Sequence, residues 1–213
     1  MTAQSASRPD TVRNQLKAQR RSQLLSAAAT LIAERGFTSV RLEDLGAAVG
    51  ISGPAVYRHF SNKEAVLVEL LVGISQYLLD GGRRVLADGA LGIAEAGTAA
   101  QPPPTTALGG LIDFHLDFAF DSPAFIRIQD RDLQNLPEAP RRKVRRLQRE
   151  YVELWVTALC ASDDTLSQSD ARIKAHAVFG LINSTPYSAG KGPSRHARSI
   201  LRAMAAGALH PSG

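Results

Sequence analysis

The sequence lacks the motifs that mark metalloproteins, nucleotide-binding enzymes and hydrolases. Its 213 residues include a single cysteine, Cys160, which excludes an internal disulfide. There is no pair of cysteines, no His-Glu-x-x-His run, no glycine-rich phosphate loop and no Gly-x-Ser-x-Gly motif. Because each of those chemistries needs its residues at a defined spacing, we expect no enzymatic activity, no metal site and no cofactor.

Long apolar runs and a targeting signal are also missing. No run approaches the roughly 18 apolar residues of a membrane-spanning helix. Residues 1–14 are polar and lack the apolar core of a signal peptide. The hydrophobic share of 44% and the charged share of 21% are ordinary for a soluble globular protein. We therefore expect a cytoplasmic protein that does not associate with membranes.

Apolar residues recur at spacings of three and four through most of the chain, and no strand pattern or internal repeat is present. The sequence therefore predicts an all-α protein. A glycine- and alanine-rich stretch that ends in three prolines, residues 87–104, is predicted to be a flexible loop. We expect helices over residues 13–34, 41–48, 53–59, 63–85, 108–120, 123–132, about 137–161, 169–184 and 194–209.

The positive charge is concentrated at the N-terminal end of the chain. Residues 1–64 hold nine lysines and arginines against five acidic residues, a net charge of +4, whereas residues 65–213 hold 16 against 15, a net charge of +1. A surface that binds phosphates requires such an excess of positive charge. The N-terminal quarter is therefore the part of the chain that we expect to meet a polyanion.

Residues 49–64, VGISGPAVYRHFSNKE, have the pattern of two helices joined by a tight turn and followed by a third. Ser52 can cap the second helix, and Pro54 falls in its first turn, where a missing N–H costs nothing. Residues 61–64, SNKE, have the pattern of a capping box that opens the next helix.

The middle of this segment separates into an inward and an outward face. Val56 and Phe60 are four residues apart and can face inward, whereas Tyr57, Arg58 and His59 have polar ends that can reach outward. A short helix that carries Tyr, Arg and His between two caps is suited to docking on DNA.

Residues 20–67 resemble the DNA-binding domain of the TetR family of transcriptional repressors. The resemblance rests on the Gly36-Phe37 corner, on Asp44-Leu45 with Val49-Gly50-Ile51-Ser52, and on residues 56–60 with Lys63-Glu64. It implies a disordered arm over residues 1–12, a three-helix helix-turn-helix domain over 13–64, and a helical effector-binding and dimerisation domain over 65–213.

The resemblance also implies roles for individual residues in binding double-stranded operator DNA. Tyr57, His59 and Lys63 are expected to contact the DNA backbone, and the base-reading face of the recognition helix is expected to comprise Ser52, Gly53, Pro54, Ala55 and Arg58. Because Gly53 and Ala55 offer almost no hydrogen bonding, we expect much of the specificity to come from half-site spacing, DNA shape and the basic residues Arg13, Lys17, Arg20 and Arg21.

Arg41 departs from the family pattern, which usually has Thr or Ser at this position. A guanidinium has no acceptor for a capping bond, so the cap of the second helix is in doubt. We keep Arg41 as an expected phosphate contact.

The C-terminal two-thirds is expected to hold an apolar effector pocket and a dimer interface. The resemblance implies a homodimer through the last two helices, about 169–184 and 194–209, and a small-molecule effector that releases the operator. Candidate pocket residues are the aromatic and polar side chains Phe114, His115, Phe118, Phe125, Arg127, Arg131, Trp155, Phe179 and Asn183.

Two features of the C-terminal region have more than one interpretation. Residues 141–149, RRKVRRLQR, are either a solvated helix face or an anion site, for example for the phosphates of an acyl-CoA. The segment 131–155 also resembles regulators of acyl-CoA metabolism.

An enzyme that uses His115 with Asp113 or Asp117 is disfavoured, because on a helix 115 points away from the face that 113 and 117 share. A regulator without an effector, or an activator, is a further possibility.

Overall fold

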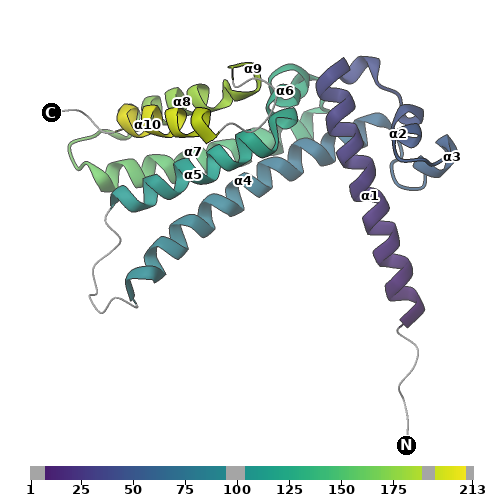
Figure 1. Cartoon of the computed structure of the whole chain (residues 1–213), viewed down its shortest axis with the longest axis horizontal. Coiled ribbons are helices and arrows are strands. Elements are labelled where there is room, and N and C mark those ends of the chain that lie inside the picture. The colour runs from purple at the N-terminus through teal and green to yellow at the C-terminus, as the bar shows by residue number, and fades with distance from the viewer. Residues whose placement is uncertain (1–7, 95–103, 189–194, 210–213) are drawn as a thin grey trace, which may run out of the picture.

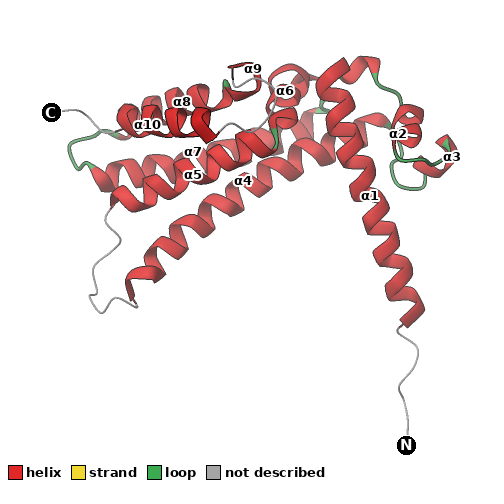
Figure 2. Cartoon of the chain, viewed as in Figure 1, coloured by secondary structure: helices red, strands yellow, loops and turns green. Residues whose placement is uncertain are grey.

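The computed structural model describes residues 8–94, 104–188 and 195–209, and within these ranges every regular element is a helix (Figure 2). The prediction of an all-α fold is confirmed. The elements are α1 (Arg8–Arg35), η1 (Phe37–Ser39), α2 (Leu42–Ala48), α3 (Gly53–Val56), α4 (Lys63–Ala94), α5 (Pro104–Asp121), α6 (Pro123–Asp132), η2 (Leu133–Asn135), α7 (Glu138–Ser162), α8 (Gln168–Asn183), α9 (Thr185–Ser188) and α10 (Arg195–Leu209).

Two hydrophobic cores lie along the long helix α4, which joins the two parts of the molecule (Figure 1). The first core contains α1, α2, α3 and the start of α4, including the fully buried Leu67 and Leu71. The second contains the later part of α4 with α5, α7, α8 and α10. With 32 residues, α4 is roughly 48 Å long, which is enough to reach from one core to the other.

The first core is not closed at residue 64, where the sequence placed the domain boundary. Three residues from further along the chain are also buried in it: Ile128 of α6, Leu136 from the connection before α7, and Val144 of α7. The helix-turn-helix part therefore completes its core with side chains from the C-terminal part, and the two parts are packed together rather than linked by α4 alone.

Two helices are longer than expected. α1 begins at Arg8, so residues 8–12 are helical rather than part of a disordered arm, and residues 1–7 lie outside the described structure. α4 continues to Ala94, so the expected loop over 87–104 is helical as far as residue 94, and α5 already begins at Pro104. Residues 95–103 lie outside the described structure. A helical glycine costs only about 1 kcal/mol relative to alanine, which the alanines and leucines here offset.

Glycines allow α4 to pack closely against its neighbours. A Cβ on Gly81 would lie 2.0 Å from the Phe114 ring of α5, and one on Gly82 would lie 2.8 Å from the Tyr151 ring of α7. Because real Cβ atoms do not approach other atoms so closely, these two positions fix how α4 lies against α5 and α7. By contrast, a Cβ on Gly73 of the same helix would meet nothing within 4 Å.

By length and composition alone, the part of α4 over Lys63–Asp88 could cross a membrane, contrary to our expectation that no such run exists. Half of its apolar window is buried within the structure. The apolar residues of this helix are explained by the two cores that it serves.

One ionisable side chain of α5 lies inside the second core. His115 is 3% exposed; its Nδ1 lies 3.3 Å from the Tyr151 hydroxyl and its Nε2 lies 3.2 Å from Oδ1 of Asn183. Burial lowers the pKa of His115 to about 4, and the bond to Asn183 offsets only part of this effect. The ring is therefore neutral at physiological pH.

Gly73 and Gly81 of α4 give opposite predictions for substitution by alanine. Gly73→Ala should raise the free energy of unfolding by about 0.5–1 kcal/mol, because alanine favours the helix and meets no neighbour. Gly81→Ala should lower it by about 1–3 kcal/mol, because its methyl group would clash with Phe114. Urea denaturation of both variants tests this, and equal effects in both would contradict the close packing of α4 on α5.

The buried histidine predicts a loss of stability in mild acid. Because its folded pKa of about 4 lies below the unfolded value of 6.5, the unfolded chain binds more protons between these values, and stability falls as the pH decreases through this window. The full shift corresponds to about 3 kcal/mol. Urea denaturation at neutral pH and at about pH 5 should show a smaller loss for His115→Gln than for the wild type. Equal losses would contradict the assignment.

Candidate nucleic-acid interface and ligand cavity

The turn between α2 and α3 is held by backbone bonds to Gly46. The carbonyl of Gly46 accepts hydrogen bonds from the amides of Ile51 at 2.9 Å and Val49 at 3.2 Å, and Gly50 has a φ of 70°. A Cβ on Gly46 would lie 2.8 Å from the Ile51 carbonyl oxygen and 2.9 Å from the Val56 side chain. Only glycine at position 46 allows the two helices to meet this closely.

The recognition helix is shorter than the predicted 53–59. Regular α-helix covers Gly53–Val56, and residues 57–59 form a turn in which the amide of His59 donates to the Val56 carbonyl at 2.8 Å. Val56 and Phe60 are buried, as predicted, at 0% and 2% exposure. Their inward packing fixes which side chains of this short segment face outward.

Two of the predicted caps are wrong in detail. Ser52 occupies the N-cap position of α3, but its side chain makes no capping bond. Pro54 has no N–H, and the amide of Ala55 already donates to the Ser52 carbonyl at 2.9 Å, so the donors that a cap would satisfy are absent or used. At α4 the cap is Asn62, whose Oδ1 accepts from the amide of Ala65 at 2.8 Å, rather than a box opened by Ser61.

Arg41 precedes α2 without a capping side-chain bond, as its lack of an acceptor predicts. The other half of a capping box is present, because the amide of Arg41 donates to Oδ2 of Asp44 at 2.8 Å. The guanidinium of Arg41 therefore stays on the exposed surface, where it has no ion-pair partner among the described residues.

The outward surface of α3 and the turn after it is short and mostly polar. Tyr57 is 52% exposed, with its hydroxyl 3.4 Å from a carboxylate oxygen of Glu43, and Arg58 is exposed with no bonded partner in the described ranges. Ser52 and Pro54 are also exposed, whereas Gly53, Ala55 and His59 are half-buried. The predicted base-reading residues, together with Tyr57 and His59, are therefore exposed or half-buried along α3 and the turn after it.

His59 lies at the edge of this surface in an unfavourable place for a positive charge. Burial, followed by the neighbouring charges of Lys17, Arg21 and Arg20, lowers the pKa of His59. Its Nδ1 is buried without a hydrogen-bond partner among the described residues. A neutral ring that keeps its proton on Nε2 leaves no unsatisfied N–H inside.

Several basic side chains of this region are held by the protein itself. Lys63 donates to the carbonyls of Phe37 at 2.7 Å and Thr38 at 3.2 Å, which leaves one of its three N–H groups for a phosphate. Arg20 donates to the Val49 carbonyl at 3.3 Å.

Arg21 pairs with Glu69, donates to the His59 carbonyl and lies 4.1 Å from the Phe60 ring centre. Arg20 and Arg21, which were expected to contribute to DNA binding, therefore also hold parts of the domain together. Arg13 and Lys17 remain exposed on the part of α1 that projects beyond the domain (Figure 1).

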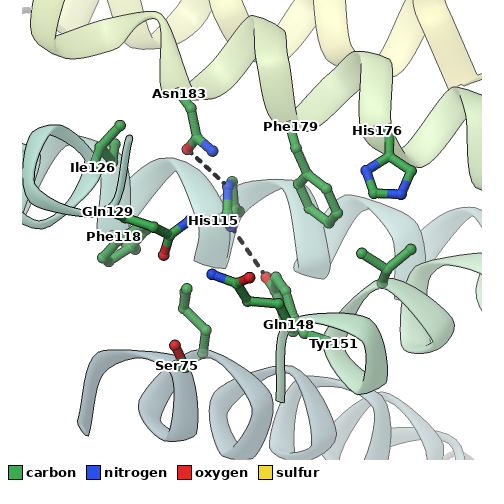
Figure 3. Close-up of a pocket in the computed structure, with 12 residues that line it drawn as sticks. Ser75, His115, Phe118, Ile126, Gln129, Gln148, Tyr151, His176, Phe179 and Asn183 are labelled. Carbon is green, nitrogen blue, oxygen red and sulfur yellow. Dashed lines mark hydrogen bonds between the residues drawn. The ribbon is translucent and has the colours of Figure 1, made fainter. Parts of the chain in front are cut away.

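A cavity of about 240 Å³ lies between α4, α5, α6, α7 and α8 (Figure 3). Of the predicted pocket residues, the structure brings together His115, Phe118, Phe179 and Asn183. The sequence missed Ser75, Gln129, Gln148 and Tyr151, which also line it. Tyr151 and Gln148 lie four and seven residues before Trp155, so the α7 periodicity contained a signal for them.

Five predicted pocket residues lie elsewhere. Phe114 packs on Tyr77, with ring centres 5.6 Å apart, and Phe125 lines a separate groove beside α1. Arg127 donates to the Pro186 carbonyl at 2.6 Å. The other two are Trp155, fully buried behind Phe179, and Arg131, which reaches α1. The sequence indicated that these side chains were large or polar, but not which neighbouring helix each would face.

Arg131 and Asp132 join α6 to the end of α1. Arg131 donates to the carbonyls of Ile32 and Ala33 and, at 3.0 Å, to Asp132. Asp132, 3% exposed, accepts a hydrogen bond from the amide of Phe37 at 3.3 Å. These contacts link the helix-turn-helix part to a helix whose residues Ile126 and Gln129 line the cavity.

Nothing near His115 forms a catalytic dyad. Asp113 and Asp117 pair instead with arginines of α10, Arg202 at 2.8 Å and Arg198 at 2.6 Å. Within the described residues, no three His, Cys, Asp or Glu side chains are placed to hold a metal ion.

The basic segment of α7 divides into paired and free charges. Arg142 pairs with Glu138, and Arg146 pairs with Glu150 at 3.3 Å. In the described part of the chain, Arg141, Arg145 and Arg149 have no ion-pair partner. Gln148 and Val152, which line the cavity, belong to the same stretch of α7 and are likewise spaced four residues apart.

Comparison with known families matches both parts of the chain. Residues 24–70 match the model of bacterial regulatory proteins of the tetR family, and residues 101–187 match a tetracyclin repressor-like C-terminal domain. The HTH-type transcriptional repressor KstR2 of Rhodococcus jostii is 40% identical over 73 residues, which are 34% of this chain and 36% of that protein. The match thus spans about a third of the length of this relative.

Solved structures resemble almost the whole chain. A TetR-family transcriptional regulator from Bordetella parapertussis has a TM-score of 0.74 at 23% identity, covering 89% of this chain and 93% of that one. AibR, in complex with isovaleryl coenzyme A and operator DNA, has a TM-score of 0.65 at 18% identity, covering 88% and 96%. With a matching helix-turn-helix, a matching C-terminal domain and this shared fold, the chain belongs to the TetR family of transcriptional regulators.

Proposed function

We propose that this protein is a dimeric, ligand-responsive repressor of the cytoplasm that binds an inverted-repeat operator and is released by a small effector. The observation that carries the proposal is the α2–turn–α3 unit, which Gly46 and the buried Val56 hold so that Tyr57 and Arg58 project from one surface. The repressor relative supports the direction of regulation.

The DNA interface in this proposal is the surface around α3. Arg58 reads a base or a phosphate, and Tyr57, His59, Arg41 and the remaining N–H of Lys63 contact the backbone. Ser52, Gly53, Pro54 and Ala55 approach the base edges, where Pro54 and Ala55 can contact thymine methyl groups. Arg13 and Lys17 extend the positive surface along the exposed part of α1.

The dimer in this proposal forms through α8 and α10. Ile173 of α8 is 68% exposed, and Ile200 and Met204 of α10, four residues apart, are 45% and 51% exposed. Apolar side chains of this size on two neighbouring helices favour burial against a second copy. Two-fold symmetry then places the two α3 segments about one DNA turn apart, as an inverted repeat requires.

The effector in this proposal enters the cavity between α4, α5, α6, α7 and α8. The free arginines Arg141, Arg145 and Arg149 lie on the same side of α7 as the cavity residues and can hold an anionic tail, such as the phosphates of an acyl-CoA. The complex of the structurally similar AibR with isovaleryl coenzyme A supports this class of effector. To release the operator, the effector must bind the non-DNA conformation more tightly.

Operator binding tests the proposal directly. In fluorescence anisotropy, the protein should bind the DNA upstream of its own gene much more tightly than a shuffled sequence. Arg58→Ala should cost about 1–3 kcal/mol for each half-site and relax base preference, whereas Arg13→Ala and Lys17→Ala should weaken all sequences alike. Each of the latter two should also reduce the slope of log K against log salt by about 1.8, because the proposed dimer loses one phosphate contact in each subunit and each contact accounts for about 0.9.

The matched control is Arg84→Ala, which removes an exposed arginine of α4 outside the helix-turn-helix part. It should leave both the affinity and the salt slope unchanged. If Arg58→Ala leaves base preference intact, Arg58 is not a reader. If the wild type binds neither DNA, a genome-wide search for bound sites decides between a distant operator and no operator.

The dimer prediction concerns the exposed apolar residues of α8 and α10. Ile173→Glu combined with Met204→Glu should convert the dimer into monomers, because the charges would be buried without partners. Operator affinity should fall by roughly a hundredfold, since two linked half-sites would become separate ones. Light scattering after size-exclusion chromatography measures the mass, and Thr157→Glu, on the exposed face of α7, is the control. A double variant that stays dimeric refutes this interface.

A further inference from the structure

Two side-chain amides of the cavity wall have no partner in the described structure. Gln129 of α6 and Gln148 of α7 point into the cavity (Figure 3), and neither makes a hydrogen bond to another described residue. Each amide offers both donors and an acceptor. The cavity therefore presents a polar pair on an otherwise mostly aromatic and aliphatic wall.

Of the other polar groups of the wall, His115, Tyr151 and Ser75 are already engaged, whereas His176 is exposed and lies against the Phe179 ring, with ring centres 6.4 Å apart. Both ring nitrogens of His115 are used, one by Tyr151 and one by Asn183, and the ring is neutral. The Ser75 hydroxyl donates to the Leu71 carbonyl of its own helix at 2.7 Å. No lysine, arginine, aspartate or glutamate is among the described residues that line the cavity.

We infer that the part of the effector that enters this cavity is an uncharged, largely apolar body with a hydroxyl or carbonyl oxygen held by Gln129 and Gln148. The inference deepens the proposed function and rests on its effector cavity. It concerns only the enclosed part of the effector, so an anionic tail outside, on the free arginines of α7, is compatible with it.

Charge and hydrogen bonding exclude the two simpler classes of occupant. An ionised carboxylate held by Gln129 and Gln148 would lose water without gaining a lysine or arginine partner, which is unfavourable. A pure hydrocarbon would displace water from the amides and leave them unsatisfied. A hydroxyl, ketone or thioester oxygen replaces that water with a direct hydrogen bond and lets the rest of the body contact the aromatic wall.

The fluorescence of Trp155 can report binding in this cavity. Trp155 is the single tryptophan, and its ring centre lies 4.9 Å from Phe179 and 6.1 Å from His115, both of which line the cavity. Its fluorescence can therefore follow titration with four probes that share one skeleton: decalin, 2-decalone, decahydro-2-naphthol and decahydro-2-naphthoate.

The ketone and the alcohol should bind roughly tenfold more tightly than decalin, the size of effect expected for one hydrogen bond, and the carboxylate should bind most weakly. Gln148→Leu and Gln129→Leu should abolish the preference for the ketone while retaining decalin binding. Gln168→Leu, on the exposed start of α8, is the matched control and should change nothing.

The possible results distinguish a failure of this inference from a failure of the proposed effector role of the cavity. Equal binding of all four probes, or tightest binding of the carboxylate, overturns the inference and leaves an effector cavity in place. No response to any probe, in a protein that still binds its operator, overturns both the inference and the effector role of this cavity. The wild-type titrations decide between these outcomes even if a glutamine variant fails to fold.

Discussion

The buried carboxylate of Asp132 is the contact on which the arrangement of the two parts depends. It is 3% exposed, and it accepts hydrogen bonds from the amide of Phe37 at 3.3 Å, from Asn135 at 3.3 Å and from Arg131 at 3.0 Å. A buried carboxylate without such partners would be very costly. Arg131 extends the network onto the last carbonyls of α1, the negative end of that helix. The end of α1 and the end of α6 are therefore fixed to each other.

This contact gives the proposed effector cavity a physical connection to the proposed DNA-binding surface. Gln129, which lines the cavity, and Asp132, which holds the amide of Phe37, are less than one helical turn apart on α6. A helix of ten residues moves as a unit, so a ligand that displaces Gln129 also displaces Asp132. The Phe37 carbonyl is held from the other side by Lys63 at 2.7 Å. Phe37, which follows α1, is thus hydrogen-bonded to both α6 and α4.

The sequence predicted best those features that depend on neighbours along the chain. The inward positions of Val56 and Phe60 and the bounds of α6 follow from local spacing and from proline, and the structure has them as expected. The cap at Ser52 was wrong because its backbone carbonyl already takes the amide that its hydroxyl needed. A local sequence pattern indicates which groups could accept a given hydrogen bond, but it does not predict which of them accepts it in the folded chain.

The candidate cavity was predictable only in part, because it depends on which helices meet. Trp155 was expected in the pocket and Tyr151 was not, but Tyr151 lines the cavity and Trp155 lies behind it. Arg20 and Arg21 illustrate the same limit for charge. Their clustering indicated a phosphate surface, yet Arg21 pairs with Glu69, which lies 48 residues further along the chain. Only the three-dimensional arrangement separates arginines that hold the domain from those that remain free.

The free side chains also limit how the proposed repressor can read DNA. On the surface of α3, Arg58 is the one long side chain among the expected base-reading residues, and a good bidentate contact to a base discriminates by about 1–3 kcal/mol. Two half-sites double this to about 2–6 kcal/mol, which reaches only the lower part of the roughly 4–10 kcal/mol that separates specific from non-specific binding. The remainder must come from the spacing that the dimer imposes and from DNA shape. In the proposed dimer, the contacts that join α1 to α6 hold each recognition segment in place on its own subunit, which a fixed half-site spacing requires.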